Sequence, residues 1–320
     1  MRPVRALTIY LSAVFVGGGL LAPWFYWAAN GTGILDPTNV PPFHRFVNRS
    51  MLVVALVGLW PFAYYCRLDT WRSVGLKREP GWLRAVGKGF LTGFTTIALI
   101  AAGSILSESR VLAFNGEFGS LASSLAAGAG TAVVVSVLEE VMFRGVVFGA
   151  LRQIYHWSIA LLVSSGLYSI LHFFRTPPLT GDVTWSSGLQ FLPLMFGGFI
   201  DPALVVPGFF VLLLAGAILA VTYERRGTIF FAIGMHAGWI FCLKSYGALT
   251  RLGPAHNESL WGSRRITDGW MAGGVMLVTL ACVLWWRSAP RESAATSATL
   301  GNIEAARRVH RREGIARESL

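Results

Sequence analysis

Long apolar stretches alternate with shorter polar segments along most of this chain. A helix needs about 20 residues to cross the roughly 30 Å hydrocarbon layer of a membrane, and several stretches reach or approach that length. Because backbone in lipid must satisfy its own hydrogen bonds, the pattern predicts an all-α fold, a polytopic membrane helical bundle. We expect about eight transmembrane helices, at about residues 7–29, 51–66, 86–106, 121–151, 157–174, 189–222, 228–243 and 269–286.

Two of these runs depart from a simple crossing. The run at 7–29 follows Arg2 and Arg5 as a secretion signal would, but it exceeds the roughly 7–15 apolar residues of a cleaved signal, so we predict a retained helix. The run at 189–222 is too long for one straight crossing and is interrupted by Asp201 and Pro202. It predicts a short re-entrant piece followed by a spanning helix.

The composition supports an integral membrane protein. Hydrophobic residues make up 54% of the chain and charged residues only 13%, against roughly 25% charged residues in ordinary soluble domains. The net charge of +11 does not indicate a nucleic-acid partner, because the basic residues gather in loops and in the C-terminal segment, where positive-inside sorting accounts for them. The expected partner of these residues is the lipid bilayer.

The distribution of basic residues also predicts the orientation. The loop at 107–120 holds only Arg110, and the segment between the second and third runs is strongly basic. This asymmetry places the N-terminus in the cytoplasm, and eight crossings return the C-terminus there, in a bacterial-type inner or plasma membrane. Only the loop with Lys244, Arg251, Arg264 and Arg265 argues the other way. The basic residues of the segment are Arg67, Arg72, Lys77, Arg78, Arg84 and Lys88.

The chain shows no internal repeat and no second folded domain. Residues 1–286 read as one membrane-embedded helical domain, and 287–320 read as a basic cytoplasmic tail that is amphipathic or disordered and touches anionic lipid. The cysteines lack the paired spacing of a disulfide framework or a metal knuckle. They are Cys66, Cys242 and Cys282.

Ionisable residues interrupt the fourth apolar run in the stretch "LEEVMFRG", residues 138–145. A charged side chain at the centre of a membrane helix costs about 2.5–3.5 kcal/mol, so such residues indicate a function. Glu140 and Arg144 lie four residues apart on one helical face, with the acid first, and are expected to pair. Glu139 is rotated from Glu140 by about 100° and is expected to face another helix.

Two histidines lie in other apolar runs, His172 and His236. A carboxylate and two imidazoles from three helices can activate water, because the carboxylate takes a proton and the imidazoles stabilise the oxyanion. The same groups could instead bind zinc with one position open for water. Glu139 comes level with His172 only if the fourth helix continues to Arg152. We therefore predict a long, tilted fourth helix and a site within the membrane, reached by a water-filled cavity.

Three short motifs resemble those of the CPBP family, the CAAX-protease and bacteriocin-processing intramembrane proteases. The stretch "EEVMFRG" resembles the first signature, E-E-x-x-x-R followed by glycine. Tyr168 and His172 in "YSILH" match the second, an aromatic residue and a histidine four positions later, with tyrosine where phenylalanine is commoner. His236 in "HAGWI" matches the third, H-x-x-x-N, but Ile240 stands in place of the asparagine. The resemblance covers about residues 90–245.

The resemblance implies a protease-like domain that hydrolyses peptide bonds. Glu139 would be the general base, Glu140 and Arg144 would orient it, His172 would help bind the water and His236 would face the oxyanion. Tyr168 would contact the substrate. Family members are described both as metalloproteases and as glutamate-dependent enzymes, and in a zinc enzyme the metal ligands would be Glu139, His172 and His236. The cofactor is thus none or zinc, and paired carboxylates beside an arginine favour water activation without a metal.

Three functions are consistent with these residues. The first is an intramembrane endopeptidase that acts on a membrane-anchored or hydrophobic peptide, with prenylated CAAX proteins and bacteriocin precursors as family substrates. Ile240 cannot donate to an oxyanion, and loss of one such donor costs about 10² to 10³ in rate, so the second is a protease-like scaffold or immunity protein. The third is a transporter, because buried acids and histidines also form proton relays, although the paired repeat halves of transporters are missing.

Overall fold

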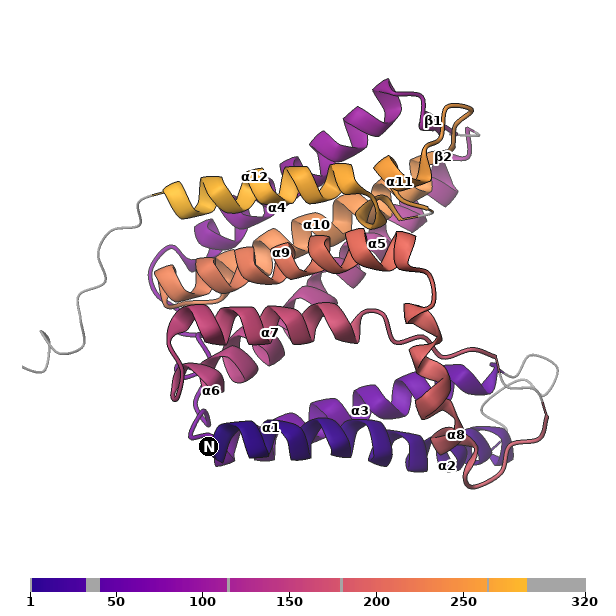
Figure 1. Cartoon of the computed structure of the whole chain (residues 1–320), viewed down its shortest axis with the longest axis vertical. Helices are drawn as coiled ribbons and strands as arrows, with labels where there is room; N and C mark the ends of the chain where they lie inside the picture. The colour runs from indigo at the N-terminus through magenta and orange to yellow at the C-terminus, as the bar shows by residue number, and fades with distance from the viewer. Residues whose placement is uncertain (1, 33–40, 114–115, 179–180, 264, 287–320) are drawn as a thin grey trace, which may run out of the picture. The chain divides into compact units, whose positions relative to one another are not determined.

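The computed structural model describes residues 2–32, 41–113, 116–178, 181–263 and 265–286, and the predicted tail at 287–320 lies outside them. The described residues form long helices that run in alternating directions (Figure 1). In chain order the elements are α1 Arg2–Ser12, the π-helical η1 Ala13–Gly17, α2 Gly18–Gly31, α3 Phe43–Tyr65, α4 Trp82–Leu106, β1 Arg110–Leu112, α5 Phe118–Glu140, the π-helical η2 Val141–Phe148, α6 Gly149–Arg152, α7 Trp157–Leu171, α8 Ser187–Leu194, the 3₁₀ turn η3 Met195–Phe199, α9 Pro202–Arg226, α10 Phe230–Leu249, β2 Thr250–Leu252, α11 Glu258–Trp261, the 3₁₀ turn η4 Ile266–Asp268 and α12 Trp270–Trp285.

The predicted all-α membrane bundle is confirmed. Five helical segments are long and apolar enough to cross a membrane, and two further apolar helices, α7 and α12, are shorter. Each predicted apolar run coincides with a helix, but length and composition identify five spans, so the number of eight crossings stays a prediction. The five segments are Arg2–Gly31, Phe43–Tyr65, Trp82–Leu106, Phe118–Arg152 and Pro202–Arg226.

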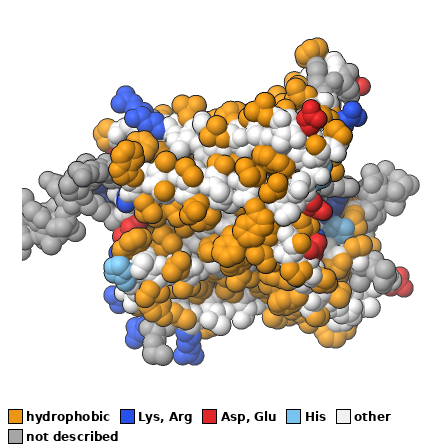
Figure 2. All heavy atoms as spheres, turned by 45° about the horizontal axis from the view of Figure 1, so that its top comes forward, with side chains coloured by type: hydrophobic (Ala, Val, Ile, Leu, Met, Phe, Trp, Pro, Cys, Tyr) orange, Lys and Arg blue, Asp and Glu red, His pale blue; other side chains and the backbone are white. Residues whose placement is uncertain are grey.

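The surface of the bundle is apolar, as a lipid environment requires. Figure 2 shows hydrophobic side chains over much of the face in view, with basic side chains toward its margins. Large apolar side chains on different helices are strongly exposed, among them Trp60 at 64%, Leu106 at 85% and Ile200 at 80%. A soluble monomer rarely exposes extended apolar patches. The chain is an integral membrane protein.

The fourth predicted helix is a single continuous segment of 35 residues, Phe118–Arg152, made of α5, η2 and α6. Its continuation to Arg152 confirms the prediction, and its length of about 50 Å exceeds the membrane core. Within it, η2 is wound as a π-helix. Such widened turns occur often at functional sites, because they re-aim side chains.

The interruption predicted in the sixth run is also present. The helical turns of α8 and η3 end before Asp201, whose carboxylate accepts a hydrogen bond from the Ala203 amide at 3.1 Å and caps α9. Pro202 occupies the first turn of α9, where its missing N–H costs nothing. The two pieces are separate helices, and a re-entrant position for the first stays a prediction.

Small residues let α10 pack directly against α4. Both helices carry glycines four residues apart, in the small-residue spacing that allows close helix packing in membranes. A Cβ on Gly93 would lie 2.0 Å from the Met235 carbonyl oxygen, and a Cβ on Gly234 would lie 2.0 Å from that of Val86. This contact fixes the position of His236 in α10. The partner glycines, Gly89 and Gly238, are similarly close to backbone.

The long α9 holds the remaining helices together. It packs against α7 on one side and α12 on another, and α10 lies between α4 and α5 (Figure 1). The only strands among the described residues, β1 and β2, form a short antiparallel pair that joins the ends of α4 and α10. The arrangement brings α5, η2, α7, α9 and α10 around one buried cluster of charges.

Candidate active site

The predicted ion pair between Glu140 and Arg144 is confirmed. Arg144 Nη1 lies 3.0 Å from Glu140 Oε1, and the two side chains are 3% and 0% exposed. The pair spans the junction of α5 and η2, so the helix itself sets the spacing. Because burying two charges removes both from water, the pair needs further polar partners to be stable.

Arg144 finds those partners on α7 and α9. Its Nη2 donates a hydrogen bond to the Gly216 carbonyl oxygen at 3.4 Å, and its guanidinium lies over the Tyr168 ring, 4.8 Å from the centroid. The contact with the Gly216 carbonyl oxygen is not predicted from the sequence. The small residues around Gly216 are the feature of the sequence that indicates close packing here. A Cβ on Gly216 would come within 2.8 Å of the Ser165 Cβ and would push α7 away.

His236 connects the two glutamates. Its Nδ1 lies 2.9 Å from Glu140 Oε1, and its Nε2 lies 3.8 Å from Glu139 Oε2. A carboxylate can only accept, so Nδ1 carries the hydrogen and donates it to Glu140. The hydrogen bond fixes the tautomer and the ring orientation, which directs Nε2 at Glu139.

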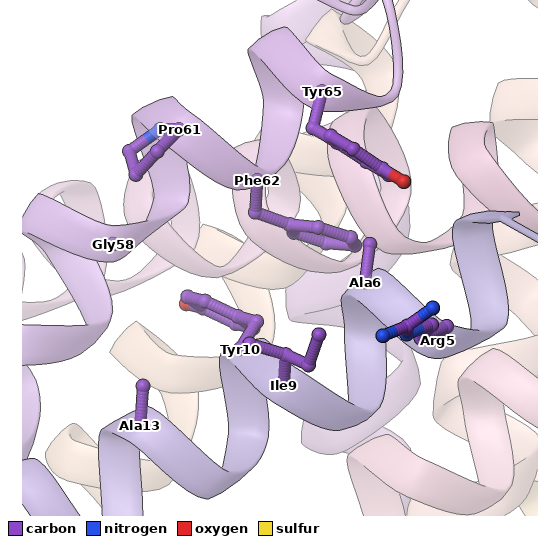
Figure 3. Close-up of a pocket in the computed structure, with 9 residues that line it drawn as sticks. All are labelled: Arg5, Ala6, Ile9, Tyr10, Ala13, Gly58, Pro61, Phe62 and Tyr65. Carbon is purple, nitrogen blue, oxygen red and sulfur yellow. The ribbon is translucent and has the colours of Figure 1, made fainter.

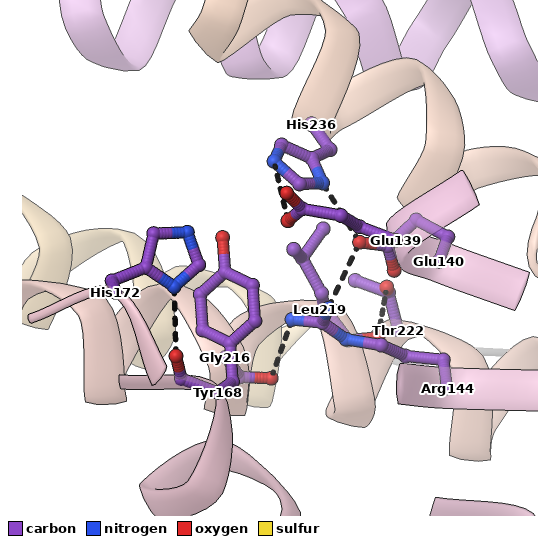
Figure 4. Close-up of polar contacts among 9 residues, drawn as sticks. All are labelled: Glu139, Glu140, Arg144, Tyr168, His172, Gly216, Leu219, Thr222 and His236. Carbon is purple, nitrogen blue, oxygen red and sulfur yellow. Dashed lines mark hydrogen bonds and ion pairs between the residues drawn. The ribbon is translucent and has the colours of Figure 1, made fainter. Parts of the chain in front are cut away.

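Glu139 is the least constrained member of the cluster. Its side chain is 23% exposed, and it faces α10 instead of Arg144, as its rotation along the helix predicts (Figure 4). Its Oε2 atom is buried and has no hydrogen-bond partner among the described residues. A buried acceptor without a partner is uncommon in proteins, and this one is available to take a proton from a bound molecule.

Tyr168 lies between the two histidines. Its ring centroid is 4.4 Å from that of His172 and 6.4 Å from that of His236. Figure 4 shows its hydroxyl directed into the space between His172 and Glu139, and the phenol is close enough to Glu139 to interact with the carboxylate. The tyrosine therefore adds a hydroxyl donor where phenylalanine would supply only a ring.

His172 joins the cluster only through Tyr168. It caps the C-terminus of α7, and its Nδ1 donates to the Tyr168 carbonyl oxygen at 2.7 Å. This bond leaves the lone pair on Nε2 free to accept a proton or to bind a polar ligand. The side chain is exposed, so His172 lies at the rim of the site, whereas His236 lies inside it.

The candidate zinc ligands are not gathered at one point in the described residues, and the use of a metal stays a prediction. Across the part of the chain that the structure describes, no group of three or more His, Cys, Asp or Glu side chains converges as a metal site requires. His172 stands on the far side of the Tyr168 ring from Glu139 and His236 (Figure 4), whereas the Nδ1 bond of His236 to Glu140 leaves its Nε2 able to bind a metal. A zinc site would need three donors at about 2.0–2.2 Å from one point.

Two polar residues beyond Ile240 do not reach the site. Ser245 donates its hydroxyl hydrogen to the Phe241 carbonyl oxygen at 2.9 Å, and the Tyr246 hydroxyl is bonded to that of Ser104 at 2.7 Å. Neither can replace the asparagine that the third motif lacks at Ile240.

An apolar groove of about 630 Å³ lies between α4, α5 and α10, and no residue of the charged cluster lines it. Its wall includes Ser136 and Val137, one turn before the glutamates, and Ile233 and Ala237, on either side of His236. The lining is apolar, which suits a hydrocarbon group more than water. The water-filled route to the site stays a prediction.

The part of the chain that holds this cluster matches a known protein family. Residues 121–242 match the family described as type II CAAX prenyl endopeptidase Rce1-like, which confirms the resemblance to the CPBP proteases. The matched part begins in α5 and ends in α10, so it holds the first, second and third motifs. No curated protein and no solved structure matches the chain.

Proposed function

We propose that this chain, which is Rce1-like over residues 121–242, is an intramembrane endopeptidase that hydrolyses a peptide bond of a membrane-anchored or hydrophobic peptide. The observation that carries the proposal is the contrast between the two glutamates. Glu140 is fully buried and paired with Arg144 and His236, whereas Glu139 Oε2 has no hydrogen bond in the described residues and meets only His236 Nε2, at 3.8 Å. One carboxylate is held in place, and the other is free to move a proton.

The first step is attack by water on the peptide carbonyl carbon. Glu139 takes the proton of the water as the new C–O bond forms, and the electron pair of the C=O bond moves to the oxygen. Arg144 and His236 both contact Glu140 Oε1 and hold its carboxylate in place. The negative charge of Glu140 in turn stabilises a positive charge on His236, which faces the reacting atoms through Nε2.

The second step breaks the C–N bond. Glu139 returns its proton to the amide nitrogen, the carbonyl re-forms, and the products are a carboxylic acid and an amine. The intermediate oxyanion needs donors that are already in place. We assign these to His236 and to the Tyr168 hydroxyl, which takes the part that Ile240 cannot play.

The substrate contacts follow from the groove beside the site. The groove wall includes Ser136 and Val137, one turn before the glutamates, and its apolar lining suits a prenyl or other hydrocarbon group. The peptide would then cross the site with its scissile bond at Glu139. A prenylated CAAX-type peptide meets both requirements.

We also propose that both termini are cytoplasmic in a bacterial-type inner or plasma membrane. The loops after α3, α6 and α9 lie at one end of the bundle, since successive helices alternate in direction (Figure 1). These loops carry most of the basic residues that the positive-inside rule assigns to the cytoplasm. They include Arg67, Arg72, Lys77, Arg152, Arg225 and Arg226.

The test is cleavage of membrane-tethered reporter peptides by the purified full chain in liposomes. The panel pairs each peptide with and without a C-terminal prenylated cysteine, and each reaction is run with and without a metal chelator. Cleavage by the native chain that Glu139→Gln abolishes and that survives the chelator would support the proposal. Loss of cleavage with the chelator alone would replace metal-free water activation by metal catalysis.

The alternative function is a protease-like scaffold that binds a peptide without cutting it, and Ile240 is the observation that favours it. Ile240→Asn restores the third motif and serves as the matched variant. A silent native chain together with an active Ile240→Asn variant would establish the scaffold and overturn the peptidase. Silence of both chains across the panel would likewise overturn the peptidase.

A further inference from the structure

A second apolar groove lies between α1 and α3. It has a volume of about 490 Å³, within the roughly 300–1,000 Å³ of small-molecule sites. Figure 3 shows that one stripe of α1, with Ala6, Ile9 and Ala13, faces one stripe of α3 across it. The rings of Tyr10 and Phe62 stack with centroids 5.1 Å apart and form its floor.

Basic residues gather at one end of this groove. Arg5 lines the groove itself, and a second cavity of about 410 Å³ continues from it, with Tyr65 in the wall of both. The second cavity is lined by Arg2 and Arg67, together with the exposed Gln153. Three guanidiniums thus face one end of an apolar channel.

No counter-charge for these arginines lies among the described residues. In the described part of the chain, no carboxylate lies within ion-pair distance of Arg2, Arg5 or Arg67. By contrast, Arg152 at the same end of the bundle is paired with Glu224. The Arg67 backbone has a left-handed φ of 57°, so the chain turns sharply after α3 and presents this side chain beside α1.

An apolar channel that ends in unpaired guanidiniums matches one kind of ligand. The groove lies between two segments long enough to cross the membrane, so its apolar part is exposed to acyl chains, and its basic end lies where the segments leave the hydrocarbon. Guanidinium binds phosphate oxygens through two parallel hydrogen bonds. Basic pockets between membrane helices recognise anionic lipid headgroups in this way.

We propose that the groove between α1 and α3 binds one anionic phospholipid, with an acyl chain over Tyr10 and Phe62 and the phosphate at Arg2, Arg5 and Arg67. The inference does not depend on the proposed peptidase. The site adjoins the catalytic helix, because the Tyr10 hydroxyl donates to the Ala55 carbonyl oxygen at 2.9 Å and lies 3.6 Å from Met142 Sδ. Met142 stands between Glu140 and Arg144 in the chain.

The experiment is photolabelling of the full chain in phosphatidylcholine vesicles that contain a trace of photoreactive lipid. One arm uses phosphatidylglycerol and the other phosphatidylcholine, with the same diazirine-bearing acyl chain, and labelled peptides are mapped by mass spectrometry. We expect phosphatidylglycerol to label residues 6–13 and 58–65 preferentially. Since each basic residue contributes about fivefold to anionic-lipid binding, the variant Arg2→Gln/Arg5→Gln/Arg67→Gln should lower that preference by at least about tenfold.

Two controls isolate the site. Arg84→Gln removes an exposed arginine at the same end of the bundle but outside both cavities, and it should leave the labelling unchanged. Ala13→Trp fills the groove without altering charge and should block labelling there. Thermal unfolding of each variant checks that the bundle is intact.

Three results would overturn the proposal. Equal labelling by the two lipids would mean that the groove holds only bulk lipid. Unchanged preference in the folded triple variant would remove the arginines from recognition. Complete protection by a large excess of sn-glycerol 3-phosphate would show a site for soluble phosphate instead of a lipid.

Discussion

One helical segment, Phe118–Arg152, carries two arginine–glutamate pairs of opposite character. Near its end, Arg152 binds Glu224 of α9 through two parallel hydrogen bonds, Nε to Oε2 and Nη2 to Oε1, both 3.1 Å, and the side chains are 34% and 24% exposed. About 12 Å earlier along the helix axis, Arg144 meets Glu140 at 3.0 Å in a buried pair.

The two pairs differ in how completely their atoms are satisfied. The pair at the helix end is bidentate, the geometry that joins guanidinium to carboxylate most effectively. In the buried pair, Glu140 Oε2 and Arg144 Nη1 have no aligned hydrogen bond among the described residues, although burial makes each omission costly. The complete pair ties α6 to α9, and the incomplete pair holds a reactive arrangement that includes His236 and Glu139.

The largest effect is expected when the buried pair is broken. Arg144→Met leaves Glu140 buried without its counter-charge, which should lower the free energy of unfolding by about 3–5 kcal/mol and abolish cleavage. Adding Glu140→Gln should recover most of the stability but none of the activity. Equilibrium unfolding in detergent measures both variants. If Arg144→Met were as stable as the native chain, the pair would contribute nothing to the fold.

The next effect concerns the donor that replaces the missing asparagine. Tyr168→Phe removes only the hydroxyl and keeps the ring over Arg144, so the melting temperature should be unchanged. The cleavage rate should fall by about 10² to 10³, as for loss of one oxyanion donor.

Trp239→Phe is the matched control for Tyr168, because the Trp239 indole nitrogen is buried in α10 without a hydrogen-bond partner in the described residues. We expect it to leave the cleavage rate unaltered. If Tyr168→Phe cleaved at the native rate and Trp239→Phe cleaved slowly, the oxyanion donor would be the Trp239 indole instead of the Tyr168 hydroxyl.

The smallest effect is expected at the complete pair. Arg152→Gln breaks a partly exposed ion pair, for which about 1 kcal/mol or less is usual. The loss should shrink further at high salt, since the charges are screened by solvent ions, and cleavage should continue at the native rate. Denaturant titrations at low and high salt measure it. A loss as large as that of Arg144→Met would erase the contrast between the pairs.

The contacts that could be predicted from the sequence are those set by the helix itself. The spacing of Glu140 and Arg144 fixed their pairing, and the need to bring Glu139 level with His172 predicted a fourth helix that continues to Arg152. Apolar runs marked the helices because each must match the membrane thickness. Interruption of the sixth run at Asp201 followed from the proline after it.

The contacts between helices could not be predicted in the same way. Nothing local determines that His236 donates to Glu140 or that Arg144 reaches the Gly216 carbonyl oxygen, because both depend on how α9 and α10 pack. The glycines of α4 and α10 govern that packing through their lack of side chains. The position of His172 at the rim also depends on packing, since its ring lies against Tyr168 and bonds to the Tyr168 carbonyl oxygen.

The most direct test of the account compares two variants on one substrate, Glu139→Gln and Arg152→Gln, each against the native chain in the same liposomes. Both remove one charge from the same helical segment, but only Glu139 is placed to move the proton. The account predicts a loss of about 10² to 10⁴ in cleavage rate for Glu139→Gln and a native rate for Arg152→Gln. Cleavage by Glu139→Gln at the native rate would contradict it.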